Sequence, residues 1–381
     1  MSLHQVTDQG GSGRADQRAV RRANLGVVLR HVASDGPLSR ASVAAGTGLN
    51  KTTVSSLVAE LMIMGLLDET GDDERPGNVG RPAQTVRLNP DGALSLGLEL
   101  HFDYLSVCST DLSGAVRFER ENAVSNRNSD PARVLDQIAG LAREALAAAE
   151  AQGVPAVGVT LAGPGLVDVR AGVLVSSPDL GWEHVPVVEM LGRRLQRPGL
   201  PIRADNESNL GALAELWAGA GHGLRDFVYV SSPHGVGAGI VLDGQLYRGA
   251  HGFAGELGHV TVDPEGPLCT CGNRGCLAML VGEDALLAIA AEHDISVRSA
   301  REAARLLAER NREGDERTLG SVQRLGHWLG IGLAGTVNVL DPEALVLGGC
   351  LGVLAPWLEQ PLRQAFAVGT LADDACEILA S

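Results

Sequence analysis

The chain is most informative over residues 255–276, which read GELGHVTVDPEGPLCTCGNRGC. The three cysteines have the spacing Cys-x-Cys-x4-Cys on a glycine-rich loop, so their sulfurs can converge on one point. An upstream histidine can complete a tetrahedron of nitrogen and sulfur donors, the ligand set of structural zinc. Chance clustering and a disulfide are the alternatives. The sequence therefore predicts a zinc site made by His259, Cys269, Cys271 and Cys276.

The predicted metal ion is expected to be structural. Four nitrogen and sulfur ligands leave no obvious open coordination position, whereas a catalytic zinc keeps one. The ion would hold the loop Pro264–Cys276 in place, together with the neighbouring side chains of Glu256 and His259. We therefore expect a structural ion and no metal catalysis.

The remaining cysteines and the N-terminus indicate a cytoplasmic protein. Residues 1–17 are polar and lack the apolar core of a signal peptide, and no run approaches the roughly 18–20 apolar residues that span a bilayer. Disulfides are rare in the cytosol, so we expect Cys108, Cys350 and Cys376 to be buried apolar thiols. No membrane partner is expected.

Length and charge suggest a small module fused to a larger body. The chain has 381 residues, more than one core usually supports. Residues 1–90 hold 10 Lys and Arg against 9 Asp and Glu, a net charge of +1, whereas the remaining 291 residues hold 21 against 37, a net charge of −16. A nearly neutral head on an acidic body fits a DNA-binding module, although ordinary fluctuation could also give this difference.

The first ninety residues resemble a helix-turn-helix. Three stretches have helical spacing of apolar residues, at 18–34, 40–45 and 51–64. Asp35-Gly36-Pro37 ends the first, and Gly46–Asn50 is a tight turn between the other two. We expect residues 1–17 to be a mobile tail and residues 18–88 to form a winged helix-turn-helix. A three-helix bundle arising by chance is the alternative.

The third helix would present short polar side chains at its N-terminal end, which suit phosphates and base edges. Lys51, the only lysine in the chain, lies where a phosphate contact is expected. The predicted DNA contacts from this region are Ser39, Arg40, Asn50, Lys51, Thr52, Thr53, Ser55 and Ser56.

A β-hairpin with a long loop follows, and it would be the wing. Gly80-Arg81-Pro82 in that loop could lie in a narrow minor groove and insert the Arg81 guanidinium. A plain linker turn explains this tripeptide equally well. Asp72, Asp73 and Glu74 would repel phosphate, so the wing tip should point away from the duplex.

From residue 92 the pattern is α/β, and its motifs resemble the ROK family of repressors and sugar kinases. The motifs are GPGLVD at 163–168, SPDLGW at 177–182, DNESN at 205–209 and the GELGH and cysteine motifs quoted above. The resemblance implies a two-lobed, actin-like (ribonuclease H-like) domain over residues 92–381 that senses sugar and forms oligomers. It points to the same four zinc ligands.

The resemblance also implies a sugar site, which is altered here. Its hydroxyl-binding positions match Asp179, Asn206, Glu207, Glu256 and His259. Family members usually carry Asn at the position of Asp179, and Glu where this chain has Ala278. The ligand should therefore be weaker, differently shaped or not a simple hexose, unless the residues are inherited scaffold without a ligand.

Kinase chemistry should be absent. Family kinases read Asp-x-Gly-Gly-Thr at a phosphate-binding turn where this chain reads Glu99-Leu100-His101-Phe102-Asp103. Pro233-His234 replaces Gly-Thr in a second phosphate loop. Glu207 stands at the position of the catalytic Asp, as in the regulator branch that resembles xylose repressors.

These observations predict a non-enzymatic repressor of carbohydrate-metabolism genes that a saccharide releases from double-stranded operator DNA. A homodimer, or a homotetramer, would place two recognition helices in successive major grooves. A kinase with a DNA-binding head is the rival hypothesis. A regulator with a vestigial sugar site that answers to another effector is a third, and activation of transcription also stays open.

Overall fold

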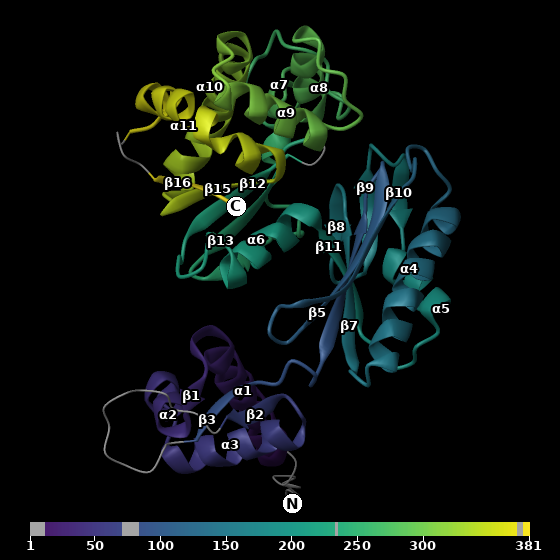
Figure 1. Cartoon of the computed structure of the whole chain (residues 1–381), viewed down its shortest axis with the longest axis vertical. Coiled ribbons are helices and arrows are strands. Elements are labelled where there is room, and N and C mark those ends of the chain that lie inside the picture. The colour runs from purple at the N-terminus through teal and green to yellow at the C-terminus, as the bar shows by residue number, and fades with distance from the viewer. Residues whose placement is uncertain (1–11, 71–83, 233–234, 372–375) are drawn as a thin grey trace, which may run out of the picture.

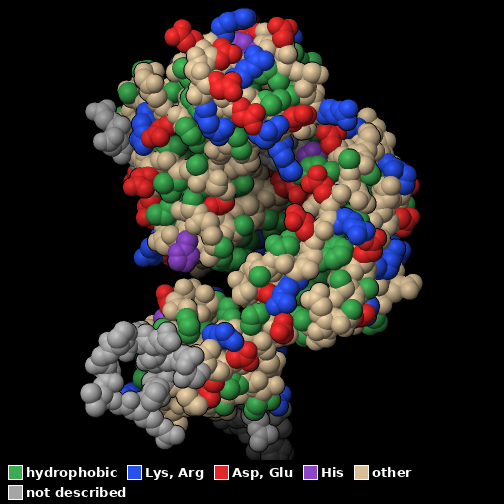
Figure 2. All heavy atoms as spheres, viewed as in Figure 1, with side chains coloured by type: hydrophobic (Ala, Val, Ile, Leu, Met, Phe, Trp, Pro, Cys, Tyr) green, Lys and Arg blue, Asp and Glu red, His purple; other side chains and the backbone are tan. Residues whose placement is uncertain are grey.

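The protein is described by a computed structural model that covers residues 12–70, 84–232, 235–371 and 376–381. An N-terminal module is followed by two larger lobes, with the module at the bottom of Figure 1 and the lobes above it. Each lobe is built around a five-stranded sheet. On the face shown in Figure 2, a groove separates the two lobes, and acidic side chains gather where they meet.

The N-terminal module contains three helices and a small antiparallel sheet of order β1-β3-β2. Four apolar residues of the third helix are buried against the other two, as their helical spacing predicted: Val54, Leu57, Val58 and Leu61. Side-chain caps begin the second and third helices, as described below. The elements are α1 (Ser12–Asp35), β1 (Leu38–Ser39), α2 (Arg40–Thr47), α3 (Lys51–Ile63), β2 (Leu67–Thr70) and β3 (Thr85–Leu88).

The start of the first helix corrects the predicted boundary of a mobile tail at residue 17. Helix α1 begins at Ser12, so residues 12–17 continue the helix that was predicted from residue 18. Extending an existing helix adds one hydrogen bond for each residue fixed, and Arg, Ala and Gln are good helix formers. Residues 1–11 lie outside the described residues.

The connection between the module and the first lobe is held at both of its ends. The Asn89 side chain donates to the carbonyl of Gly65 at 2.8 Å, and its backbone N–H donates to Leu66. Arg117 of the first lobe donates to the Asp91 carboxylate at 2.9 Å. A Cβ on Gly92 would lie 2.1 Å from the Gly65 carbonyl oxygen, so only glycine fits there. We call this connection, residues 89–92, the joint.

The first lobe packs helices α4 and α5 against a sheet of order β11-β7-β4-β5-β6. Burial alternates along β4, which explains its alternating sequence pattern. A second sheet, of order β10-β9-β8, completes the lobe. The elements are β4 (Leu94–Leu100), β5 (Tyr104–Asp111), β6 (Val116–Ala123), α4 (Pro131–Ala151), β7 (Ala156–Gly163), β8 (Leu166–Asp168), β9 (Val173–Ser177), β10 (Trp182–Val185), α5 (Val187–Leu195) and β11 (Ile202–Asn206).

The second lobe has a sheet of order β14-β13-β12-β15-β16 between two helical layers. Helix α6 packs on one face, and the larger core lies between the other face and helices α7 to α11. The elements are α6 (Glu207–Ala218), β12 (Phe227–Ser231), β13 (Gly237–Leu242), β14 (Gln245–Tyr247), η1 (Leu257–His259), α7 (Leu277–Val281), α8 (Glu283–Glu292), α9 (Ala300–Arg312), α10 (Glu316–Leu340), β15 (Ala344–Gly348), α11 (Gly349–Gly369) and β16 (Glu377–Ala380).

The end of the chain combines helix and strand. Helix α11 ends at Gly369, and residues 377–380 form strand β16. This strand pairs in parallel with β15 and supplies partners to backbone groups at the edge of the sheet. Among the described residues, no helix is both long and apolar enough to cross a membrane.

Candidate functional site

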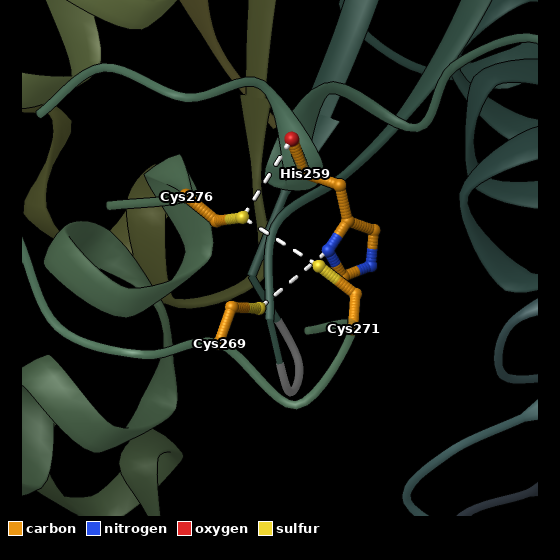
Figure 3. Close-up of side chains that lie close together, drawn as sticks. All are labelled: His259, Cys269, Cys271 and Cys276. Atoms are coloured by element: carbon orange, nitrogen blue, oxygen red, sulfur yellow. Dashed lines mark hydrogen bonds between the residues drawn. The ribbon is translucent and has the colours of Figure 1, made fainter. Parts of the chain in front are cut away.

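The four predicted metal ligands lie together in the second lobe (Figure 3). His259 ends the short helix η1, and Cys269, Cys271 and Cys276 come from the loop that follows. The donor atoms all lie within 4.8 Å of one another. Cys269 Sγ is 3.7 Å from His259 Nδ1, and Cys271 Sγ is 3.7 Å from Cys276 Sγ. The structure therefore brings together the residues that the sequence selected.

The local backbone explains why the three sulfurs converge. The Cys269 N–H donates to the carbonyl of Asn273, and the Gly272 N–H donates to the carbonyl of Cys269, so the chain reverses between the cysteines. Gly275 has a φ of 61°, and a Cβ there would lie 1.5 Å from the Asp263 carbonyl oxygen. The glycines of the motif are thus needed for the tight fold of the loop.

The geometry fits a four-coordinate metal ion. With Zn–S bonds of about 2.3 Å, two sulfurs of a tetrahedral site lie about 3.8 Å apart, close to the observed separations. Burial, with the neighbouring thiols of Cys271 and Cys269, raises the pKa of Cys276 to about 12. A cation would have to displace that proton, which is how thiolate sites couple metal binding to folding.

A cavity of about 180 Å³ adjoins the metal ligands, and all five predicted sugar-site residues line it: Asp179, Asn206, Glu207, Glu256 and His259. They come from the turn after β9, the junction of β11 with α6, and the segment around η1. Ala278 also lines the cavity, so the altered position faces the predicted site. We call this space the acidic cavity, after the carboxylates of Asp179, Glu207, Glu256, Glu283 and Asp284 that line it.

Asn206 and His259 each have a structural partner that fixes the side chain. The Asn206 side chain caps helix α6 by accepting from the Ser208 N–H at 2.8 Å, and it donates to the Gly165 carbonyl. His259 Nδ1 faces the Cys269 sulfur, which leaves Nε2 as the ring nitrogen for the cavity. These two residues shape the wall, and Asp179, Glu207 and Glu256 place carboxyl groups in it.

Two carboxyl groups of the acidic cavity, those of Glu207 and Glu256, have raised pKa values. Burial, followed by repulsion from Glu99, Asp179 and Glu256, raises the pKa of Glu207 to about 8. Burial also raises the pKa of Glu256, although His259 opposes the change. Burial and repulsion from neighbouring carboxylates each disfavour the charged form of a carboxyl group.

The turn at residues 101–103 is filled by protein groups. Phe102 is 2% exposed, and the Arg127 guanidinium carbon lies 3.6 Å from the centre of its ring. The N–H of Asp103 donates to His101 Nδ1, and the N–H of His101 donates to the Tyr104 carbonyl. Two backbone donors of this turn are therefore engaged by protein groups. The second altered loop, Pro233-His234, lies outside the described residues.

Sequence reasoning missed several residues of the cavity. Arg127 was not singled out, yet it lines the wall and lies 3.8 Å from the Asp179 carboxylate. Glu283 and Asp284 begin helix α8 and face the same space. No local motif marks these three positions, because segments that are distant in the sequence meet there only in the folded chain.

In the N-terminal module, the predicted DNA contacts divide into exposed and structural side chains. Lys51, Thr52 and Ser56 are exposed on α3, and Thr53 and Ser55 are half-buried. Asn50 accepts from the Thr53 N–H and caps α3, and Ser39 accepts from the Ser42 N–H and caps α2. Arg40 pairs with Glu69 at 2.6 Å. Arg81 lies outside the described residues.

A basic face of the first helix was not identified from the sequence. Arg18, Arg22 and Arg30 are exposed and line one shallow groove along α1, which passes over Gly26. Helical spacing could have shown this face, since the three positions differ by four and eight residues.

Comparison with known proteins places these sites in a family context. Residues 95–378 match the profile of the ROK family. The xylose repressor of Bacillus spizizenii is 31% identical over 335 residues, which are 87% of this chain and 83% of that protein. A glucokinase of Halalkalibacterium halodurans is 32% identical over 237 residues, 58% of this chain and 70% of its own length. A crystal structure of a ROK family transcriptional regulator, a homologue of the Escherichia coli MLC protein, superposes with a TM-score of 0.78 at 25% identity, covering 95% of this chain and 92% of that one.

Proposed function

The chain belongs to the ROK family, and from this we propose that it is a transcriptional repressor that leaves its operator when a sugar binds. One observation carries the proposal: the same chain joins a helical module with an exposed polar helix end to a cavity lined by every predicted sugar-site residue. Relatives named as repressors cover both parts, whereas the glucokinase match covers 58% of the chain.

The N-terminal module is proposed to be a winged helix-turn-helix. Helix α3 would enter the major groove with Lys51, Thr52 and Ser56, and the hairpin β2–β3 would be the wing. Arg18, Arg22 and Arg30 on α1 would add phosphate contacts that fix the register without reading sequence. In a homodimer, the two α3 helices would lie roughly 34–36 Å apart, one turn of the duplex.

The metal of the loop is proposed to be a structural zinc ion held by the four residues of Figure 3. When bound, zinc would neutralise the clustered thiolates and cross-link the loop to η1. The position of η1 in turn fixes part of the cavity wall, because Glu256 precedes this short helix and His259 ends it. The Cys269 sulfur fixes the direction of the imidazole.

The domain is proposed to bind sugar without phosphorylating it. Phe102 and Arg127 fill the turn where kinases of the family bind phosphate, and Asp103 adds negative charge beside it. Phosphoryl transfer depends on donors that stabilise the phosphate charge, and here protein groups already engage two backbone donors of this turn. A kinase with a fused DNA-binding head is the second candidate, favoured by the glucokinase relatives.

A gel-shift experiment tests the repressor proposal. Full-length zinc-loaded protein is titrated onto the DNA upstream of its own gene, with and without a panel of monosaccharides and disaccharides. We expect tight, salt-sensitive binding that one sugar releases, and about tenfold weaker binding for Lys51→Ala. Arg193→Ala, on the surface of α5, is the control and should bind like the parent.

Two outcomes would contradict the proposal. Failure to bind the upstream DNA would remove the local repressor function, and ATP turnover with a sugar would then support the kinase candidate. Binding that no sugar disturbs would leave a DNA-binding regulator whose effector is not a sugar.

A further inference from the structure

The acidic cavity has a strong imbalance of charge. Five carboxylate side chains line it, and Arg127 is the one Lys or Arg side chain among its described lining residues. That guanidinium is itself engaged, because it stacks on Phe102 and lies 3.8 Å from the carboxylate of Asp179. A ligand in this space therefore meets several carboxyl groups and little opposing positive charge, an arrangement that favours a cation.

Two carboxyl groups of the cavity have raised pKa values, and a positively charged ligand would lower them. Burial and then the charge of Asp103 raise the pKa of Glu283 to about 7, in addition to the raised pKa of Glu207. An opposite charge within about 4–6 Å favours the ionised form of a carboxyl group. A cation in the cavity would thus ionise these groups and be held by them.

Two buried hydroxyl groups provide independent evidence for a ligand. Ser177 and Ser208 are each 1% exposed, both line the acidic cavity, and neither Oγ atom has a hydrogen-bond partner in the structure. A buried polar group without a partner costs about 1–3 kcal/mol, so such groups usually have one. Ligand hydroxyls would supply these partners, which fits a small polyhydroxyl molecule.

The size of the space limits the ligand further. At about 180 Å³, it is smaller than the roughly 300–1,000 Å³ of pockets for drug-sized molecules. A single sugar ring is the matching class, and the charge of the walls disfavours a phosphate or carboxylate on that ring.

We infer that the effector is an amino sugar, a monosaccharide with a free ammonium group that lies among Asp179, Glu207 and Glu256. The ring hydroxyls bond to Ser177 and Ser208. This inference rests on the proposed sugar-responsive function and narrows its ligand class.

Calorimetric titration of the full-length zinc-loaded protein tests the inference with matched ligands. Glucosamine, galactosamine and mannosamine are each compared with the N-acetyl form, the parent hexose and the hexose 6-phosphate. For one stereochemical series, we expect the free amine to bind about tenfold or more tightly than the parent hexose, because charge is the difference between them. The N-acetyl form should lose this advantage, and the phosphate should bind most weakly.

A charge-removing variant assigns the preference to the cavity. Glu256→Gln should reduce the ratio of amine affinity to parent-hexose affinity about fivefold or more, whatever it does to the affinity for the parent hexose itself. Glu313→Gln, exposed at the end of α9, is the matched control and should keep the ratio unchanged. An unaltered ratio in Glu256→Gln would place the amine elsewhere and overturn the inference.

The ligand series separates this inference from the function on which it rests. If a parent hexose binds as tightly as its amine and releases the DNA, the inference fails and the sugar-responsive repressor stands. If a hexose 6-phosphate binds most tightly and releases the DNA, the amino-sugar inference also fails and the sugar-responsive repressor stands. If no sugar of any charge binds while the protein still holds its DNA, the sugar response itself fails, and the amino-sugar inference fails with it.

Discussion

The cluster of four metal ligands (His259, Cys269, Cys271 and Cys276) and the acidic cavity share His259, but their charged groups are arranged in opposite ways. In the loop, four donor atoms from a short stretch of chain surround one point, so a single cation can satisfy them all. In the cavity, carboxylates from distant segments face an open space and raise one another's pKa. A site completed by a permanent ion can serve as a scaffold, whereas a site left with excess charge and unpaired hydroxyls suits a ligand that exchanges.

The largest expected effect comes from breaking the loop. Cys276→Ser removes a fully buried ligand, so the protein should lose its metal and its midpoint of thermal unfolding should fall by roughly 10 °C. Metal content is measured by mass spectrometry and unfolding by calorimetry. Cys108→Ser, on β5, is the control and should keep both values. Retention of the metal by Cys276→Ser would show that the other three residues suffice.

A smaller change in the unfolding temperature should follow from replacing a buried carboxyl group of the acidic cavity. The pKa of Glu207 is about 8 in the folded protein against an ordinary 4.5, so between these values the folded state holds a proton that the unfolded state has lost. Stability from this group is therefore present below pH 4.5 and declines as the pH rises to 8. Glu207→Gln should raise the unfolding temperature more at pH 8 than at pH 5. An equal shift at both pH values would contradict the electrostatic explanation.

The contact that fills the turn at residues 101–103 should have an effect of about 1 kcal/mol. Arg127→Ala removes the stacking on Phe102 and the pairing with Asp179, and cation–π contacts contribute roughly 0.5–2 kcal/mol. The free energy of unfolding, measured with denaturant, should fall by that amount. Arg193→Ala serves as the control, and an equal loss in both variants would show that Arg127 has no special role.

The smallest effect should distinguish hydroxyls that await a ligand from hydroxyls that are already bonded. Ser177→Ala removes an unpaired group and should leave stability unchanged or raise it by up to about 1 kcal/mol, while weakening sugar binding. Ser321 is equally buried but bonds to His293 at 2.9 Å, so Ser321→Ala should cost about 1 kcal/mol. Equal losses in both variants would mean that Ser177 has a partner in solution.

The same contrast explains what the sequence could reveal. Ligands His259 to Cys276 lie close together along the chain, so their spacing alone indicates their convergence. Helix α3 was equally accessible, because its caps and apolar stripe are local signals. The resemblance supplied Asp179 and Glu256, but no family motif includes Arg127 or Glu283.

The missed features depend on packing between distant segments. Arg127 meets Phe102 and Asp179 through the arrangement of three loops, and Glu283 reaches the cavity from the other lobe. Strand β16 could not be found from local pattern, because its pairing with β15 is a tertiary contact. Helix α1 was placed too late because the pattern at its start is polar, although those residues favour helix.

The joint at residues 89–92 gives the molecule mechanical stiffness. A flexible linker would let the two parts turn independently and would dissipate any motion of the lobes as swivelling. Here the Asn89 side chain donates to the carbonyl of Gly65, just after α3, and Arg117 donates to the Asp91 carboxylate. Gly92 packs closely against the same Gly65 carbonyl. The first lobe and the module are therefore connected without a flexible linker. Under the proposed function, a rotation of the first lobe on ligand binding would be passed to α3, and in a DNA-bound dimer it would change the positions of both recognition helices.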